Sequence, residues 1–237
     1  MKFLDDIMDI VGGQDVTYVC FVCDHSGSMK MSLENGKTKA DAAQENFNEY
    51  IATLKKESES DMETLVTIVE FDDTIKCTER HKLIKEVSPM TSYWTGGMTA
   101  LYDAIAMGIN TISKSMDRDD RKNKAALVII QTDGAENFSS DYSGREGQKR
   151  LQKMISELEE SGLWTFVFLG ENIDKNLAYD IGMTPNNFMK TEATGQSYTT
   201  TNYAVNAGLS NYYNSRKVGF TQSKSFFKAE EENVNNT

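Results

Sequence analysis

Two short polar loops of the sequence each combine an aspartate with hydroxyl side chains. Residues 24–28 are Asp-His-Ser-Gly-Ser and residues 131–134 are Gln-Thr-Asp-Gly, and each loop follows an apolar stretch. If the two aspartates lie close together, their carboxylates repel each other unless one is protonated or a cation sits between them. Ser26 and Ser28 are two positions apart, so an extended turn would aim both hydroxyls in the same direction. The two loops therefore suggest a cation site.

A third loop adds another hydroxyl. Residues 95–99 are Thr-Gly-Gly-Met-Thr and lead into an expected helix, which Thr99 could also cap. A set made only of oxygen ligands, without a cluster of Cys or His, favours a hard divalent cation over zinc. We expect Mg²⁺, with Mn²⁺ or Ca²⁺ as the alternatives. The expected metal ligands are Asp24, Ser26, Ser28, Thr99 and Asp133.

The apolar pattern of the chain predicts the elements that position these loops. The expected strands cover residues 16–22, 64–71, 74–78, 125–130, 163–169 and 187–190, and the expected helices cover residues 39–56, 100–113, 144–160, 173–181 and 203–213. This alternation predicts an α/β fold, Rossmann-like and doubly wound, with about six mostly parallel strands, one antiparallel edge strand and helices on both faces. Ligands of such sheets bind at the carboxyl ends of the strands. Asp24 and Asp133 would converge there if their strands are neighbours.

Length and composition bound the organisation of the chain and its partners. The 237 residues, 39% hydrophobic and 26% charged, fit one domain at residues 15–216, between a lead-in at residues 1–14 and a loosely ordered tail at residues 217–237. A net charge of −11 repels a phosphate backbone, so we expect no nucleic-acid partner.

Cysteine usage and the apolar stretches bear on the compartment. Three cysteines are an odd number and too few for a disulfide framework, which indicates a reducing environment. Aspartates interrupt residues 1–10, where a signal peptide needs an apolar core, and no apolar stretch is long enough to span a membrane. We expect a cytoplasmic protein that does not bind a membrane.

The order and spacing of the polar loops resemble a known family. The segments Asp24-x-Ser26-x-Ser28, Thr99 in Gly-Gly-Met-Thr-Ala-Leu, and Asp133 in Thr-Asp-Gly are similar to the metal-ion-dependent adhesion site of a von Willebrand factor type A domain. The similarity extends over about residues 15–213. Within the family, the chain resembles the stand-alone intracellular members of bacteria and phages, including those linked to tellurite resistance, more than the secreted adhesion proteins.

The resemblance implies a protein-interaction module and not an enzyme. It implies that the five side chains hold the metal directly or through water and leave one coordination position open. An Asp or Glu of a partner protein would fill that position. We therefore expect an adaptor whose partner is another protein, and a second copy of the chain is one such partner.

Two other functions stay open as alternatives. Asp24 beside Mg²⁺ could accept a phosphoryl group in a phosphatase-like hydrolase, although Ser26 stands where such enzymes place a second aspartate. The chain could also be a structural subunit that assembles with itself through a carboxylate of a neighbouring copy.

Three further features are expected to have no part in the site. His25 is expected on the surface, pointing to solvent, and Cys20 and Cys23 are expected to be core thiols. Residues 36–38, Gly-Lys-Thr, imitate the end of a phosphate-binding loop, but Met31 stands where that motif needs a glycine.

Overall fold

The computed structural model describes residues 15–58, 62–171, 173 and 175–228. The predicted lead-in at residues 1–14 and the last part of the predicted tail, residues 229–237, lie outside the described residues. None of the helices in the described ranges combines the length and the apolar content that crossing a membrane requires.

The described strands form one sheet of six strands in the order β3-β2-β1-β4-β5-β6. All neighbouring strands are parallel except β2 and β3, which pair antiparallel at the edge. The fold class predicted from the sequence is therefore confirmed. The strands are β1 (Asp15–Asp24), β2 (Met62–Phe71), β3 (Ile75–Leu83), β4 (Lys124–Thr132), β5 (Trp164–Glu171) and β6 (Phe188–Thr191).

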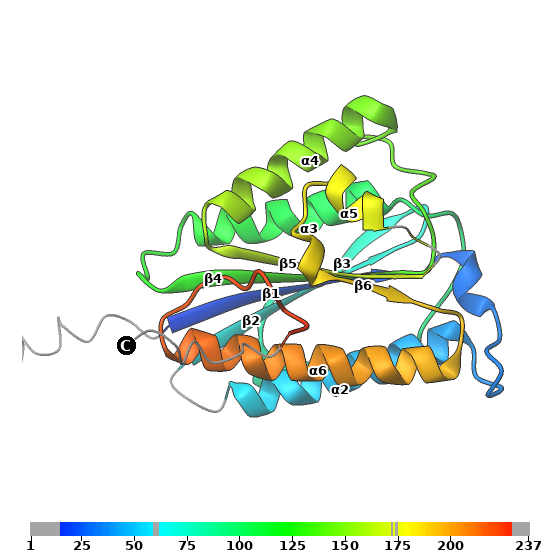
Figure 1. Cartoon of the computed structure of the whole chain (residues 1–237), viewed down its shortest axis with the longest axis horizontal. Coiled ribbons are helices and arrows are strands. Elements are labelled where there is room, and N and C mark those ends of the chain that lie inside the picture. The colour runs from blue at the N-terminus through cyan, green and yellow to red at the C-terminus, as the bar shows by residue number, and fades with distance from the viewer. Residues whose placement is uncertain (1–14, 59–61, 172, 174, 229–237) are drawn as a thin grey trace, which may run out of the picture.

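Helices cover both faces of this sheet, as Figure 1 shows. One face carries α3 (Leu101–Met116), α4 (Gly144–Glu160) and the short α5 (Lys175–Asp180), and the other carries α2 (Lys39–Glu57) and α6 (Gly195–Lys217). Each pair of layers encloses its own apolar core. The sheet is therefore buried on both faces, which explains the nearly continuous apolar run of its central strand.

Strand β1 shows how the sequence serves both cores. Tyr18, Cys20 and Val22 belong to the core under α3 and α4, whereas Phe21 and Cys23 belong to the core under α2 and α6. Cys20 and Cys23 are buried, unpaired and on opposite faces, because an odd number of positions separates them in the strand. The prediction that both are core thiols is confirmed.

Two elements are longer than their apolar pattern predicts. Helix α6 begins at Gly195 rather than near residue 203. Its first turns are polar, so the apolar pattern does not reveal them. Thr194 caps this start, and its side chain accepts a hydrogen bond from the Ser197 N–H. Strand β3 continues to Leu83 rather than ending near residue 78. It lies at the sheet edge, where polar side chains alternate with half-buried ones.

The chain after α6 differs from the loosely ordered tail that the sequence predicts. Phe226 is 2% exposed, and its backbone N–H donates a 2.8 Å hydrogen bond to Oδ1 of Asn187. Its ring lies against Gly208 of α6, where an added Cβ would come within 2.3 Å of Phe226 Cε1. The segment around Phe226 is therefore packed against the domain, whereas residues 217–220 are exposed.

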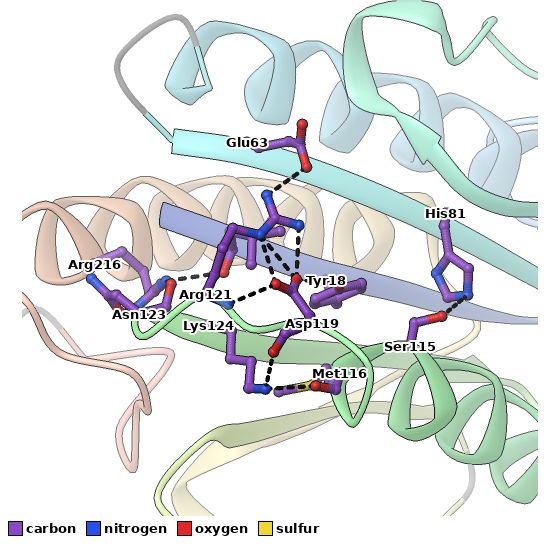
Figure 2. A network of polar contacts seen from close by, with 11 residues as sticks. Tyr18, Glu63, His81, Ser115, Met116, Asp119, Arg121, Asn123, Lys124 and Arg216 are labelled. Carbon is purple, nitrogen blue, oxygen red and sulfur yellow. Dashed lines mark hydrogen bonds and ion pairs between the residues drawn. The ribbon is translucent and has the colours of Figure 1, made fainter. Parts of the chain in front are cut away.

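A buried arginine ties the end of α6 to the amino ends of the central strands. Arg216 is 1% exposed and donates hydrogen bonds to the backbone oxygen of Val16, to Thr17 Oγ1 and to both oxygens of Asn123. Figure 2 shows Arg216 beside Asn123. This network closes the end of the sheet that is opposite the two aspartate loops.

Next to it lies an ion pair network on the loop before β4 (Figure 2). Arg121 pairs with Asp119 at 2.8 Å and with Glu63 at 2.7 Å, and the Tyr18 hydroxyl donates a 2.6 Å hydrogen bond to Asp119. The Arg121 hydrogen bonds hold the pKa of Asp119 well below its usual range, although partial burial opposes them. This end of the molecule is therefore held by charge as well as by packing.

Candidate metal centre

The sheet order places the two predicted aspartates at the same edge. Asp24 is the last residue of β1, and Asp133 directly follows β4. The two strands are parallel neighbours, with Cys23 opposite Gln131. The condition under which the two loops were expected to converge is therefore met at the carboxyl edge of the sheet.

Asp24 is held by hydrogen bonds to both of its carboxylate oxygens. The Ser26 N–H donates to Oδ1 at 2.7 Å, and the Thr132 hydroxyl donates to Oδ2 at 2.5 Å. The side chain is fully buried. Burial raises the pKa of Asp24 to about 6, although the hydrogen bonds from Ser26 and Thr132 favour the charged form and Asp133 adds a smaller repulsion.

The two serines bring their hydroxyls together and connect to Asp133. Ser26 caps a short 3-10 turn, η1 (Gly27–Lys30), in an extended conformation, and its Oγ lies 3.1 Å from Ser28 Oγ. Ser28 then donates a 2.6 Å hydrogen bond to Oδ1 of Asp133. Four of the five predicted ligands thus form one hydrogen-bonded group.

Thr99 joins this group through the loop that follows Asp133. A Cβ added to Gly134 would lie 3.6 Å from Thr99 Oγ1, so the hydroxyl faces the residue after Asp133. The Thr99 carbonyl accepts the N–H groups of Asn137 and Phe138 at 3.0 and 3.2 Å. Helix α3 is capped by Ala100 without a side-chain bond, so Thr99 is not its cap. All five predicted residues therefore meet at one edge.

The glycines before Thr99 let its loop approach the first aspartate loop. The Gly97 carbonyl accepts the Gly27 N–H at 3.2 Å, and Gly97 has a φ of +60°. A Cβ at this position would lie 2.8 Å from Cγ of Asp73 in the β2–β3 turn. A left-handed backbone in such close contact requires glycine.

The structure adds two charged residues that sequence reasoning missed. Lys39 begins α2 and is 2% exposed, and its Nζ donates a 2.8 Å hydrogen bond to Asp133 Oδ2 and a second bond to Glu171 Oε1. Burial alone would lower the pKa of Lys39, but the bonds to the two carboxylates outweigh it and raise the pKa. Glu171 ends β5 at the same edge, and this placement was the signal that could have revealed it.

The prediction that His25 points to solvent is wrong. His25 is fully buried and stacks on Tyr93, with ring centroids 3.9 Å apart and planes 4° apart. The Trp94 ring lies 4.4 Å from it, tilted by 30°. Its Nδ1 lies 2.7 Å from the Trp94 carbonyl oxygen, and its own carbonyl accepts the Gly96 N–H. Residues 93–96 therefore cover His25 and support the first aspartate loop from outside.

The donor set fits a hard divalent cation. Within the described ranges, no group of three or more His, Cys, Asp or Glu side chains is placed to hold a metal, so a zinc-type cluster is not seen there. The five predicted residues instead offer two carboxylates and three hydroxyls. Together with Lys39 and Glu171, the buried charges are three carboxylates and one ammonium, and the excess is negative. A dication suits that excess.

Comparison with known proteins agrees with this geometry. A family model described as von Willebrand factor type A domain matches residues 19–204. No curated protein matches the chain. Solved structures share the fold at low identity. They include the PilB minor pilin from Streptococcus sanguinis (14% identity, 82% of this chain and 61% of that one, TM-score 0.57) and a von Willebrand factor type A protein from Catenulispora acidiphila (15%, 84% and 43%, 0.55).

A third similar structure is proximal thread matrix protein 1 from the mussel byssus, described with a zinc-occupied MIDAS motif. It is 15% identical, with 86% of this chain and 47% of that one covered and a TM-score of 0.51. The chain spans less than two thirds of the length of each of these three proteins. At such identities the likeness shows the fold alone.

Proposed function

Because the chain belongs to the von Willebrand factor type A domain family, we propose that it is a metal-dependent protein-interaction module. The observation that carries this proposal is the convergence of its polar loops on one buried, negatively charged group at the carboxyl edge of the sheet. The residues that would hold the divalent cation are Asp24, Ser26, Ser28, Thr99 and Asp133.

Mg²⁺ is the proposed ion, with Mn²⁺ and Ca²⁺ as alternatives. The reason is chemical, since carboxylate and hydroxyl oxygens are the ligands that hard cations prefer. The zinc named for the mussel protein makes Zn²⁺ a useful comparison in any binding experiment.

The proposed partner is a protein that presents an Asp or Glu side chain. A bound dication would supply an electrophilic centre for that carboxylate. Hydroxyl ligands suit this role, because they neutralise little of the charge of a cation. Both aspartates also accept hydrogen bonds from the chain itself. Ser26 and Thr132 donate to Asp24, and Ser28 and Lys39 donate to Asp133.

The surface around the site supports a protein partner. Three large apolar side chains are exposed on the three loops that carry the proposed ligands: Met31 at 57%, Met98 at 47% and Phe138 at 49%. Met31 directly follows the η1 turn, Met98 precedes Thr99, and Phe138 donates its N–H to the Thr99 carbonyl. Exposed apolar groups next to a polar centre are typical of protein contact surfaces.

A capture experiment tests the proposal. The tagged full chain would be used to recover partners from its native cells in Mg²⁺ and, in parallel, in chelator. We expect recovery in Mg²⁺ only, and we expect Asp133→Ala to abolish it. Asp117→Ala, an exposed acid at the end of α3, is the matched control and should recover the same partners. Equal recovery by Asp133→Ala would contradict the proposal.

The proposal excludes an enzymatic role, and this can be tested separately. A phosphatase-like site needs a second aspartate two positions after Asp24, and this position is Ser26. A screen of phosphate esters with Mg²⁺ should therefore give no turnover. Turnover that disappears in Asp24→Asn would favour the phosphatase. Light scattering with and without Mg²⁺ tests self-assembly, since a metal-dependent increase in mass would favour the structural subunit.

We propose a cytoplasmic location and no nucleic-acid or membrane partner. All three cysteines are unpaired, which supports a reducing compartment. The net charge of −11 opposes binding to anionic polymers and anionic membrane surfaces.

A further inference from the structure

We propose that Lys39 is a built-in counter-ion that competes with the metal for Asp133, and that Glu171 limits this competition. The inference rests on the metal site proposed above and concerns what sets its affinity. It starts from the two oxygens of Asp133. Ser28 donates to Oδ1 at 2.6 Å, and Lys39 donates to Oδ2 at 2.8 Å.

The Lys39 ammonium is held in place from several sides. Its side chain is 3% exposed, and the Lys39 N–H donates to the Met31 carbonyl at 3.0 Å. Thr38, which precedes Lys39, and Asp41, which follows it, form a reciprocal cap that fixes the first turn of α2. The buried ammonium is therefore held by its bonds to Asp133 and Glu171, at the fixed first turn of α2.

A fixed ammonium beside Asp133 acts on any second cation that uses the same carboxylate. Like charges a few ångströms apart repel, and the repulsion is strong where water is excluded. Lys39 should therefore weaken the binding of a dication while it stabilises the metal-free state, in which it neutralises Asp133. Its role is to position Asp133 and to set the charge of the site, and it need not touch the metal.

Glu171 acts in the opposite sense. It is 1% exposed, accepts a hydrogen bond from Lys39 and lies 3.4 Å from the Tyr198 hydroxyl through Oε2. Its negative charge offsets part of the repulsion between the Lys39 ammonium and a cation at Asp133. Loss of either partner should shift metal affinity, and the two losses should shift it in opposite directions.

The test is a charge-balanced cycle on the full chain: wild type, Lys39→Met, Glu171→Gln and the double variant. Mg²⁺ affinity is measured by calorimetry, and thermal unfolding is measured in chelator. We expect Lys39→Met to bind Mg²⁺ about tenfold more tightly and Glu171→Gln about tenfold more weakly. The double variant, which restores the net charge, should bind within about threefold of wild type. In chelator, Lys39→Met should unfold at a lower temperature than wild type.

Each outcome decides the inference. Unchanged or weaker Mg²⁺ binding by Lys39→Met overturns it, because a lysine that only orients Asp133 would give that result. A shift in the same direction for both single variants also overturns it. If Lys39→Met does not fold, Glu171→Gln still tests the sign, since unchanged or tighter Mg²⁺ binding by this variant overturns the inference. A wild type that binds no dication refutes the metal site itself, whereas one that binds Mg²⁺ but captures no partner refutes only the adaptor role.

Discussion

The Ser28 hydroxyl donates a 2.6 Å hydrogen bond to Oδ1 of Asp133, across 105 residues of sequence. This bond joins the loops that follow two neighbouring parallel strands, β1 and β4. The fold therefore brings together polar side chains that lie far apart in the sequence. This means that a metal would bind only the folded protein, which gives the first prediction.

Mg²⁺ should raise the melting temperature of the wild-type chain. A ligand that binds only the native state stabilises it, by about 2.7 kcal/mol at a hundredfold excess over its Kd. Asp24→Ala and Asp133→Ala should lose this gain, because each removes a carboxylate from the site. Thermal unfolding in Mg²⁺ and in chelator measures it, with Asp117→Ala as the control that keeps the gain. An equal gain in Asp133→Ala would refute the proposed ligand set.

Thr99→Val should weaken Mg²⁺ binding about 10- to 100-fold, whereas Thr99→Ser should bind nearly as wild type. Valine keeps the shape of threonine but removes the hydroxyl that faces Gly134. The backbone bonds from Asn137 and Phe138 to the Thr99 carbonyl are unaffected by either change. Calorimetric titration measures the affinity, and circular dichroism checks that both variants fold. Equal affinities of the two variants would remove Thr99 from the site.

Phe226→Ala should destabilise the domain by about 3 kcal/mol. The ring is 2% exposed and packs on Gly208, so its removal leaves a cavity and frees the segment after α6. The matched control is Phe220→Ala, since Phe220 is 61% exposed, and its effect should stay within about 0.5 kcal/mol. Urea unfolding compares the two. Similar, small effects would mean that the tail is as loosely held as the sequence suggests.

Asp119→Asn should cost about 1–3 kcal/mol at neutral pH and progressively less in acid. The hydrogen bonds from Arg121 lower the pKa of Asp119 in the folded chain, so its stabilising effect is present above the ordinary aspartate pKa of about 3.9. That effect is lost as the pH falls toward the folded-state pKa. Unfolding free energies of wild type and variant, measured from pH 7 down to acid, should therefore converge. A constant difference would show that charge is not the cause.

Much of the site follows from the sequence because one rule governs it. Asp24 and Asp133 each end an apolar strand, and neighbouring parallel strands bring such ends together. This rule does not predict the burial of His25. Its burial depends on Tyr93 and Trp94, which lie about seventy positions away, so local polarity suggests exposure instead. The rule does not predict the buried position of Lys39 either, since a lysine in the first turn of a helix is usually solvated.

The fold is predictable to the extent that burial is periodic. The central strands bury both of their faces, and α2, α3 and α4 each bury one apolar stripe. The apolar pattern of the sequence therefore predicts these elements. The first turns of α6 are polar and are held by the Thr194 cap, so periodicity misses them. Phe226 is a single apolar residue in a polar segment, and only its contact with Gly208 makes it part of the core.

The ring contact between Trp94 and His25 gives the molecule an optical reporter. The chain has two tryptophans, and Trp164 lies at the opposite end of the sheet, at the start of β5. In a Trp164→Phe variant, all indole fluorescence would arise beside the first aspartate loop. Emission intensity could then follow the arrival of a cation in real time, without a label.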